Sequence, residues 1–367
     1  MDRSDLALPL SGLSVVEISG IESVSYACML LGQLGATVTK VEPPEGDALR
    51  RRAPLAPSVS AQDAPVSVAF EFLNAAKSSA LYDANDPVAA ARIGSLIDEA
   101  DILVSDHWTL GEIGLVLPQR RRGQLRFSIG LYGGHPDEAV PSSALTRLHA
   151  GTSGYIIPAD AELSKRPAWS GPYIFECMHG VGLAVAIVAE RVRVDGADVD
   201  YSLQAYGLWL DKLLFSRTST SGVEIHRNTA AYPYTGNIPC ADGFVAMLVL
   251  EEHQWRGFCR MIDRPEWLKD ERFANGVLRN RNRAPLAEAL VAWCAVHTVD
   301  EVLEAARKND VPAGRCRRPQ EVLDADIAAA RSFFVERETA FGTVRVPSLP
   351  FGPGLRGQVD IPSPKLG

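Results

Sequence analysis

The chain of 367 residues lacks several features that would place it in a large class of proteins. No stretch of about 18 apolar residues is free of charge, so the sequence predicts no membrane-spanning helix. The first ten residues contain acids and no apolar signal-peptide core, so we expect a cytoplasmic protein. The 6 cysteines include no C-x-x-C pair. That spacing predicts reduced thiols, with neither a disulfide framework nor a zinc site.

An excess of positive charge is also missing. The 37 Lys and Arg residues stand against 45 Asp and Glu residues, which gives a net charge of −8. A protein that binds nucleic acid carries a basic face, so nucleic acid is not an expected partner. The runs Arg50–Arg52 and Arg120–Arg122 are local exceptions, and such runs are usually solvated surface. The length favours two lobes.

The first half of the chain alternates between predicted strands and helices. Short apolar runs rich in β-branched residues predict strands at residues 13–19, 36–42, 78–82, 101–105 and 125–130. Helical patterns occur at residues 26–34 and 87–98. This alternation predicts an α/β fold with a parallel sheet covered on both faces. The loop at residues 20–25 has no G-x-G-x-x-G, which argues against an ordinary dinucleotide site.

The second half has a different character. A helix-rich stretch covers residues 178–219, and a hairpin with Asp242-Gly243 at its turn is predicted within residues 232–250. Amphipathic helices follow at residues 285–296 and 299–308. We therefore expect a smaller α+β domain beside the large one. The predicted boundaries are 1–205 for the large domain, completed by 330–367, then 206–224 for a linker and 225–329 for the small domain.

The most informative segment brings a carboxylate, a thiol and an imidazole within four residues. Glu176, Cys177 and His179 lie just before the apolar run 181–189. A charge at the start of a buried helix must be paired, solvated or used in catalysis. Glu176 is therefore a candidate catalytic residue. The alternative is that it only stabilises the helix, since acids are favourable in a first turn. A Cys/His pair is an acyl-transfer arrangement, but residues two apart on a helix point to different faces.

Several segments together resemble the class III CoA-transferase family, also called the CaiB/BaiF family. The matching segments are residues 13–19, 30–47, 73–79, 99–104, 199–205, 310–314, 321–324 and 330–334. The resemblance covers nearly the whole chain. It implies a Rossmann-like large domain that binds CoA and a smaller domain, in an interlocked homodimer. It also implies coenzyme A or acyl-CoA and a small carboxylic acid as substrates, with no metal.

The resemblance assigns the nucleophile to the segment Glu176-Cys-Met-His-Gly180. In the family an aspartate opens this D-x-x-x-G pattern and attacks the acyl-CoA thioester. A mixed anhydride and then an enzyme–CoA thioester form, which is covalent catalysis. Here Glu176 stands in the place of that aspartate. It carries the same functional group on a stem longer by one methylene, and a displacement of about an angstrom can cost roughly a hundredfold in rate.

The resemblance also implies a CoA site. It is expected to include Ile21, Ser23, Lys40, Glu42, Asn74, Lys77 and Asp106. Lys40 and Glu42 match the family's K-V-E-P-P pattern, and Asn74 and Lys77 match its N-x-x-K pattern. Ser78 replaces a common cation, and Asp106 replaces a common asparagine. Both changes weaken the attraction for phosphates.

Other assignments remain open from the residues alone. Glu22 takes the position of a family glutamine near the thioester. If Glu22 met Glu176, the two carboxylates would share a proton and one pKa would rise, which suits acid–base chemistry. Racemases of the same fold carry the motif G-H-D-x-N-Y near residues 141–146. This chain has Pro141-Ser-Ser-Ala-Leu-Thr146 there, and the missing histidine argues against racemisation by the usual His/Asp pair. Besides the transferase, a second reading is a repurposed family member with other acyl-thioester chemistry, either biosynthetic acyl or thiol transfer or acid–base isomerisation. A non-catalytic binding dimer is the third reading, because fold alone does not fix function.

Overall fold

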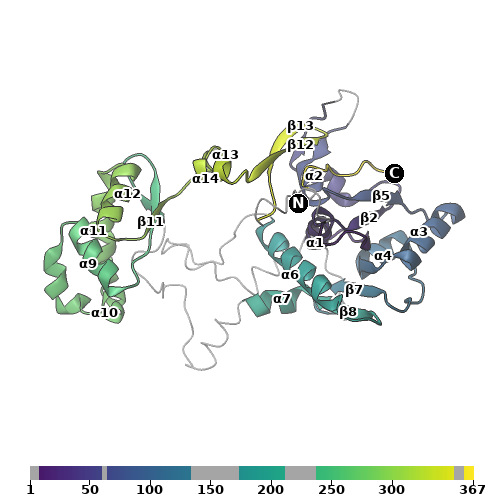
Figure 1. Ribbon diagram of the computed structural model, residues 1–367, viewed down its shortest axis with the longest axis horizontal. Coiled ribbons are helices and arrows are strands. Elements are labelled where there is room, and N and C mark those ends of the chain that lie inside the picture. The colour runs from purple at the N-terminus through teal and green to yellow at the C-terminus, as the bar shows by residue number, and fades with distance from the viewer. Residues whose placement is uncertain (1–7, 60–63, 134–172, 211–236, 351–358) are drawn as a thin grey trace, which may run out of the picture. The chain divides into compact units, whose positions relative to one another are not determined.

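The computed structural model describes residues 8–59, 64–133, 173–210, 237–350 and 359–367. The chain divides into two compact units, shown in Figure 1. The first comprises residues 1–156, 169–220 and 326–367, and the second comprises residues 157–168 and 221–325. The predicted linker, 206–224, falls mostly outside the described residues.

The first unit is built on a six-stranded parallel sheet. Its strands are β1 (Ser14–Ile18), β2 (Thr37–Glu42), β5 (Ser78–Leu81), β6 (Ile102–Asp106), β7 (Leu125–Gly130) and β8 (Ala197–Ser202). Their spatial order is β5-β2-β1-β6-β7-β8. The order reverses direction between β1 and β6, and in doubly wound sheets ligands bind outside the carboxyl ends of the strands at such a reversal.

The sequence missed the sixth strand. Residues 178–219 were predicted to be helix-rich, yet β8 lies within them. Its sequence, Ala-Asp-Val-Asp-Tyr-Ser, alternates small or apolar residues with acids and is only partly buried. This is the pattern of an edge strand with one solvated face rather than of a buried parallel strand. The five predicted strands are confirmed to within two residues at each end.

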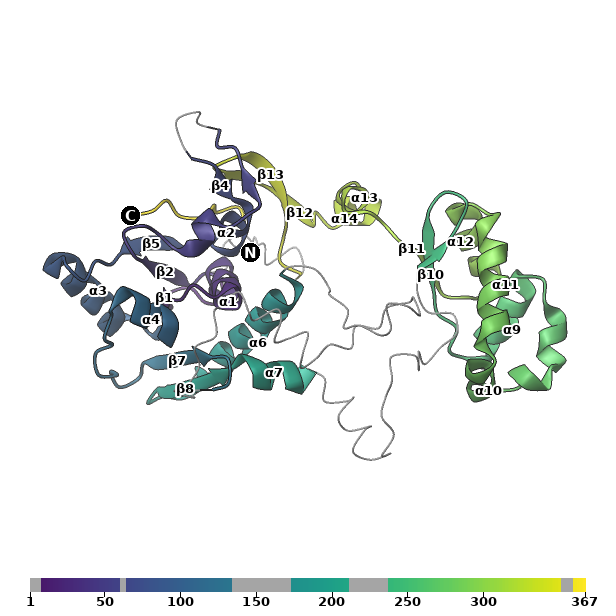
Figure 2. The same cartoon turned by 180° about the vertical axis from the view of Figure 1, so that it is seen from behind.

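Helices cover both faces of the sheet. α1 (Glu22–Gln33) and α6 (Ile174–Glu190) share one apolar core with one face, and Leu203 at the start of α7 (Leu203–Leu210) joins it. α3 (Pro87–Glu99) packs on the opposite face together with α4 (His107–Ile113). Figure 2 shows the same layers from behind. The α/β fold with both faces covered is therefore confirmed.

The start of α1 differs from the prediction. The sequence placed residues 20–25 in a loop and began the helix at Tyr26, but α1 begins at Glu22. Its N-cap is Ile21, which offers no side-chain hydrogen bond to the first turn. Isoleucine is a poor N-cap residue, so the usual signal for a helix start is missing. Glu22 and Ser23 consequently lie in the first turn of a helix.

Smaller elements complete the first unit. They are η2 (Ala48–Arg51), β3 (Leu55–Ala56), β4 (Val66–Ser67), α2 (Val68–Leu73), α14 (Asp326–Ala330) and the hairpin of β12 (Phe334–Thr339) and β13 (Gly342–Pro347). The hairpin's turn accepts a hydrogen bond at Ala340 O from Val59 N, 2.9 Å away. Near the C-terminus, Ile361 O accepts one from Ala76 N at 3.3 Å. The last part of the chain thus packs on the same unit as the first strands.

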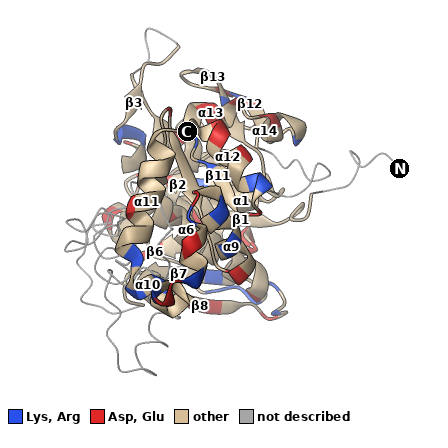
Figure 3. Cartoon of the chain, turned by 90° about the vertical axis from the view of Figure 1, so that its left-hand side faces the viewer, with Lys and Arg blue, Asp and Glu red and all other residues tan. Residues whose placement is uncertain are grey.

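The second unit combines helices with a small antiparallel sheet. Its elements are β9 (Asn237–Pro239), β10 (Phe244–Met247), α9 (Glu252–Met261), η5 (Pro265–Lys269), η6 (Glu271–Phe273), α10 (Gly276–Arg281), α11 (Arg283–Ala295), α12 (Val299–Lys308), β11 (Ala313–Arg315) and α13 (Pro319–Leu323). β9 and β10 form the predicted hairpin around Asp242-Gly243. Helices α9, α11 and α12 enclose an apolar core. In Figure 3 basic and acidic residues are interspersed.

Candidate active site

Two helices begin at the carboxyl edge of the sheet. α1 connects the parallel strands β1 and β2, and α6 leads into β8, which is parallel to β7. A helix that joins parallel strands runs back against them, so its N-terminus lies at their carboxyl ends. The first turns of α1 and α6 therefore lie at the same edge. These turns carry Glu22, Ser23 and Glu176.

The two helices meet at Gly180. A Cβ atom at this position would lie 2.7 Å from Ser23 O and 2.8 Å from Tyr26 Cδ1, closer than packed atoms allow. Glycine is therefore required for the close approach of α6 to the first turn of α1. Glu176 lies one turn earlier on the same face of α6, and only 7% of it is exposed. The E-x-x-x-G spacing thus combines a buried carboxylate with the glycine that brings the helices together.

The neighbouring thiol and imidazole do not form a nucleophilic pair. Burial, and then the charge of Glu176, raise the pKa of Cys177 to about 11, so the thiol is protonated near neutral pH and is a poor nucleophile. His179 Nδ1 lies 2.9 Å from Phe175 O, and Nε2 lies 2.9 Å from Leu203 O. Both ring nitrogens thus face backbone carbonyls rather than Cys177, and burial lowers the pKa of the imidazole.

A buried ionic cluster supports the carboxyl end of β1. Glu17, which the sequence did not single out, lies between two lysines. Lys40 Nζ is 2.8 Å from Glu17 Oε1, Lys77 Nζ is 2.6 Å from Oε2, and all three side chains have no exposed surface. Burial alone would raise the pKa of Glu17, but the two ammonium groups outweigh it and lower the pKa to about 2. The one signal for a buried acid was the position of Glu17 within the otherwise apolar run Val15-Val-Glu-Ile18 of β1.

The same lysines hold the backbone on both sides of the α1 start. Lys40 Nζ donates to Ser19 O at 2.6 Å. Lys77 Nζ donates to Ser25 O at 2.9 Å and to Asn74 Oδ1 at 2.8 Å. Lys40 also pairs with Asp47 at 2.7 Å. Two charge-assisted bonds therefore fix the segment that carries Ile21, Glu22 and Ser23.

Glu42 is also engaged inside the protein. It has no exposed surface, and Arg50 binds both of its carboxylate oxygens, at 2.6 and 2.7 Å. Ser79 Oγ donates a further bond at 2.7 Å. Burial raises the pKa of this carboxyl, but the bonds from Arg50, Asp47 N and Ser79 outweigh it and lower the pKa.

The arginine run also reaches the first turn of α1. Arg52 forms an ion pair with Glu22, which is only 3% exposed. Arg51 binds the carbonyl oxygen of Glu45 at 2.6 Å. The run was predicted to be solvated surface, and Arg51 is exposed. Its guanidinium groups also bind acceptors within the protein, a pairing that residue spacing did not reveal.

Asp106 ties β6 to the end of β1. Its carboxylate accepts bonds from Thr109 N at 2.8 Å and Thr109 Oγ1 at 3.0 Å, which caps α4. Thr109 Oγ1 in turn accepts a bond from Gly20 N at 3.0 Å. Burial raises the pKa of Asp106. Asp106 thus lies at the reversal of strand order, beside the backbone that leads into α1.

The structure sorts the predicted site residues into two groups. Ile21, Glu22, Ser23 and Asp106 lie at the carboxyl edge of β1 and β6, and Glu176 lies at the start of the adjoining helix. The other predicted CoA residues lie in the buried support beneath them: Lys40, Glu42, Asn74 and Lys77. The racemase motif position, residues 141–146, is outside the described residues.

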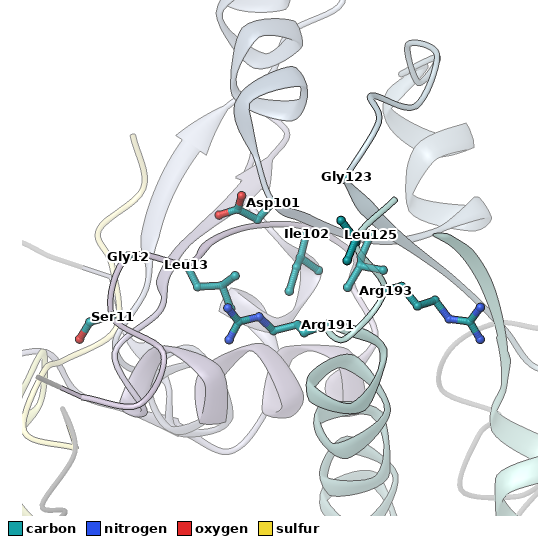
Figure 4. A pocket seen from close by; sticks show the side chains of 10 residues that line it. Ser11, Gly12, Leu13, Asp101, Ile102, Gly123, Leu125, Arg191 and Arg193 are labelled. Atoms are coloured by element: carbon teal, nitrogen blue, oxygen red, sulfur yellow. The ribbon is translucent and has the colours of Figure 1, made fainter. Parts of the chain in front are cut away.

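A cavity of about 360 Å³ opens at the opposite edge of the sheet (Figure 4). Its lining residues are Ser11, Gly12, Leu13, Asp101, Ile102, Gly123, Leu125, Arg191, Arg193 and Val194. Arg191 and Arg193 follow the end of α6, where cations offset the negative end of a helix dipole. None of the predicted site residues lines this cavity, so we place the candidate site at the carboxyl edge.

Metal and membrane features are not found in the described part of the chain. Within it, no three His, Cys, Asp or Glu side chains are grouped so that they would hold a metal ion. None of its helices combines the length and the apolar character needed to cross a membrane.

Comparisons with known proteins identify the family and agree with the fold. The family model CoA-transferase family III matches residues 10–367. The chain is 26% identical over 380 residues to a succinate–glutarate CoA-transferase of Agrobacterium fabrum, covering 98% of this chain and 93% of that protein. It is also 26% identical over 387 residues to the alpha subunit of a succinyl-CoA–L-malate CoA-transferase of Chloroflexus aurantiacus, covering 98% and 86%. The crystal structure of a CAIB/BAIF family protein from Brucella suis matches with a TM-score of 0.79 at 24% identity, covering 98% and 97% of the two chains. The chain belongs to CoA-transferase family III.

Proposed function

We propose that this protein transfers CoA from an acyl-CoA to a carboxylic acid, with Glu176 as the covalent nucleophile. The observation that carries the proposal is the position of Glu176. It is a buried carboxylate in the first turn of α6, one turn before the glycine that contacts the start of α1. The names of the two relatives contain succinate, glutarate and malate, which supports a short dicarboxylic acid as one substrate.

The proposed reaction proceeds through acyl transfer to Glu176. A carboxylate oxygen of Glu176 adds to the thioester carbonyl carbon, and the carbonyl electron pair moves to its oxygen. The carbon–sulfur bond then breaks, so the CoA thiolate leaves and a mixed anhydride remains. The thiolate attacks the Glu176 carbonyl of this anhydride, which releases the donor acid and forms a glutamyl–CoA thioester. The acceptor carboxylate takes CoA by the same two steps in reverse, which restores Glu176.

For CoA itself, we propose contacts at the carboxyl edge. Ile21 and Ser23 are at the start of α1, and Asp106 is at the end of β6. Lys40 and Lys77 are proposed to support this edge rather than to bind phosphate. Each ammonium group is buried against Glu17, and a phosphate contact would require breaking that pair at a cost of several kcal/mol.

The acid–base alternative is less well supported by the geometry. It requires Glu22 to share a proton with Glu176. Arg52 forms an ion pair with Glu22, and a neighbouring cation stabilises the ionised carboxylate. Because Arg52 already engages the Glu22 carboxylate, the geometry favours a positioning role for Glu22 over proton exchange with Glu176.

We also propose an interlocked homodimer. A stripe of exposed apolar side chains runs along α6 and supports an interface there. It consists of Ile174, Met178, Val181, Val185 and Val188, each between 40% and 64% exposed. The spacing of four and three residues is that of a helix seam, and a contiguous exposed apolar patch indicates an interaction site. A two-fold dimer would place the same stripe on each chain.

Covalent trapping tests the proposed nucleophile. Wild-type protein incubated with succinyl-CoA should gain the mass of CoA, and hydroxylamine should convert one residue, located by peptide mass spectrometry at Glu176, to a hydroxamate. Glu176→Gln, which is nearly isosteric, should give neither product while retaining the thermal stability of the wild type. A CoA adduct on Glu176→Gln, or a wild-type protein whose mass never changes with any short dicarboxylyl-CoA, would refute the assignment.

A further inference from the structure

We propose that Ser23 Oγ and the backbone N–H groups of the first turn of α1 bind the carbonyl oxygen of the acyl-CoA thioester during transfer. This inference rests on the proposed function and adds a catalytic group to it. The ligand is an oxyanion, which develops when Glu176 adds to the thioester carbon. The family resemblance implied only that Ser23 contacts CoA, and it gave the hydroxyl no chemical task.

The first observation is a buried hydroxyl that has no hydrogen-bond partner. Ser23 is 2% exposed, and no atom in the described residues forms a hydrogen bond with its Oγ. Leaving a buried hydroxyl unpaired costs about 1–3 kcal/mol. Because buried polar side chains nearly always have partners, the exceptions need an explanation such as a bound group. A substrate oxygen at this position would supply the missing partner.

The second observation is the set of donors around this hydroxyl. α1 has 12 residues, and its N-cap Ile21 provides no side-chain acceptor. The N–H groups of a first helical turn have no acceptor within the helix. Ser23 is the second residue of α1, and Cα–Cβ bonds tilt toward the helix N-terminus. The hydroxyl and the free N–H groups therefore face the same end, where the helix dipole favours negative charge.

The amides on either side of the first turn of α1 already have acceptors of their own. Ile21 N donates to Ser19 Oγ at 3.1 Å, and Gly20 N donates to Thr109 Oγ1. Ser25 N donates to Ile21 O at 3.0 Å. Each of these amides flanks the first turn and already has an acceptor. The donors that remain at the mouth of the helix are those of the first turn itself.

The surrounding charges suit an oxyanion. Glu22 shares the first turn and would repel a developing negative charge, but Arg52 pairs with its carboxylate. The bonds from Lys40 to Ser19 O and from Lys77 to Ser25 O fix the backbone before and within this turn. Donors held in place before the reaction stabilise a transition state without a reorganisation cost. The contact of Gly180 with Ser23 O brings the first turn of α6, with Glu176, beside this site.

Ser23→Ala tests the inference against a matched serine. Removing one oxyanion donor usually lowers kcat by 10²–10³-fold, and we expect about a hundredfold loss here, because the backbone donors remain. KM for acyl-CoA should change less than threefold, since the interaction forms in the transition state. The melting temperature should stay constant or rise, because an unpaired buried hydroxyl is removed. Ser14→Ala is the control: Ser14 Oγ donates to Asp101 at 2.9 Å at the other edge of the sheet, so this variant should lose stability and keep its kcat.

The outcomes separate this inference from the proposed function. Formation of the CoA adduct is first timed in the wild type by rapid quench. If the wild type forms the adduct and Ser23→Ala forms it at the same rate, the hydroxyl has no catalytic role and the inference fails alone. If Ser23→Ala loses activity only together with folded protein, the role is structural and the inference also fails. Absence of an adduct in the wild type overturns both proposals.

Discussion

At the scale of single residues, Glu17 is the buried acid to which two buried lysines bind. Its two carboxylate oxygens each bind a different buried lysine. The side chain has no exposed surface, so its interactions are screened little by solvent. Removing one partner of a buried pair leaves an uncompensated charge and typically costs 3–5 kcal/mol. Glu17 therefore links the stability of the sheet to the geometry of the α1 start.

Glu17→Gln should change the response of stability to acid. The two lysines hold the folded pKa of Glu17 at about 2, below the ordinary value of 4.5. The ionised carboxylate therefore contributes stability that is fully present above pH 4.5 and is lost as pH falls towards 2. Between pH 6 and pH 3.5, the wild type should lose about 1.4 kcal/mol more free energy of unfolding than the variant, because pH 3.5 lies one unit below the unfolded pKa and each unit is worth 1.36 kcal/mol. Urea unfolding at both pH values measures the difference.

The control keeps this prediction testable if Glu17→Gln folds poorly. Glu17→Gln combined with Lys77→Met removes one lysine along with the acid, and should recover part of the lost stability. Equal acid responses in the wild type and the double variant would show that Glu17 is not the group that titrates in this range.

Local sequence pattern predicted where Glu176 lies, but it did not predict the ion pairs around the start of α1. Glu176 was found from a charge at the mouth of an apolar helix, and it is buried in the first turn of α6. Glu17 and the pairing of Arg52 with Glu22 were missed, because ion pairs between residues far apart in sequence leave no local pattern. The resemblance assigned Lys40 and Lys77 to the CoA site. It did not show that Glu17 lies beside both of them, because a lysine's type does not reveal its partner.

At the scale of elements, the contact between α1 and α6 positions the site. The two helices share a core with one face of the sheet, and Gly180 sets their separation at the first turns. Five of the six strands of the parallel sheet were predictable from local sequence pattern, as were α3, α11 and α12. The α1 start was not, because Ile21 gives no capping signal. Its position is instead fixed by the tertiary bonds from Lys40 and Lys77.

Gly180→Ala should separate these helices. The new Cβ would lie 2.7 Å from a backbone oxygen, which cannot rotate away, so overpacking should cost about 1–3 kcal/mol. A shift of about an angstrom between Glu176 and the start of α1 should lower kcat roughly a hundredfold. Thermal unfolding and steady-state rates measure the two effects.

Gly94 in α3 provides the matched control. A Cβ atom there meets nothing within 4 Å, so Gly94→Ala should raise stability by about 0.5–1 kcal/mol through helix propensity and leave kcat unchanged. Should Gly180→Ala behave like Gly94→Ala, the close approach of the helices would not be what positions the site.

At the scale of the whole molecule, the exposed stripe on α6 bears on assembly. Val185 on this stripe is 64% exposed, while Val88 on α3 is 79% exposed and stands outside it. If α6 is part of an interface, a charge at Val185 is buried on assembly, whereas a charge at Val88 stays in solvent. Refolding should therefore yield much less dimer for Val185→Glu than for Val88→Glu, as measured by light scattering after size-exclusion chromatography.

An interlocked dimer differs from an ordinary one in how its chains exchange. Two chains that thread through each other cannot part by dilution, because separation requires one chain to open. Tagged and untagged homodimers mixed at nanomolar concentration should thus form no mixed dimers over days. The same mixture, unfolded in urea and refolded, should give tagged, mixed and untagged dimers near a 1:2:1 ratio. Mixed dimers that appear without urea would indicate an ordinary side-by-side interface, and a monomer at every concentration would remove the dimer from the proposal.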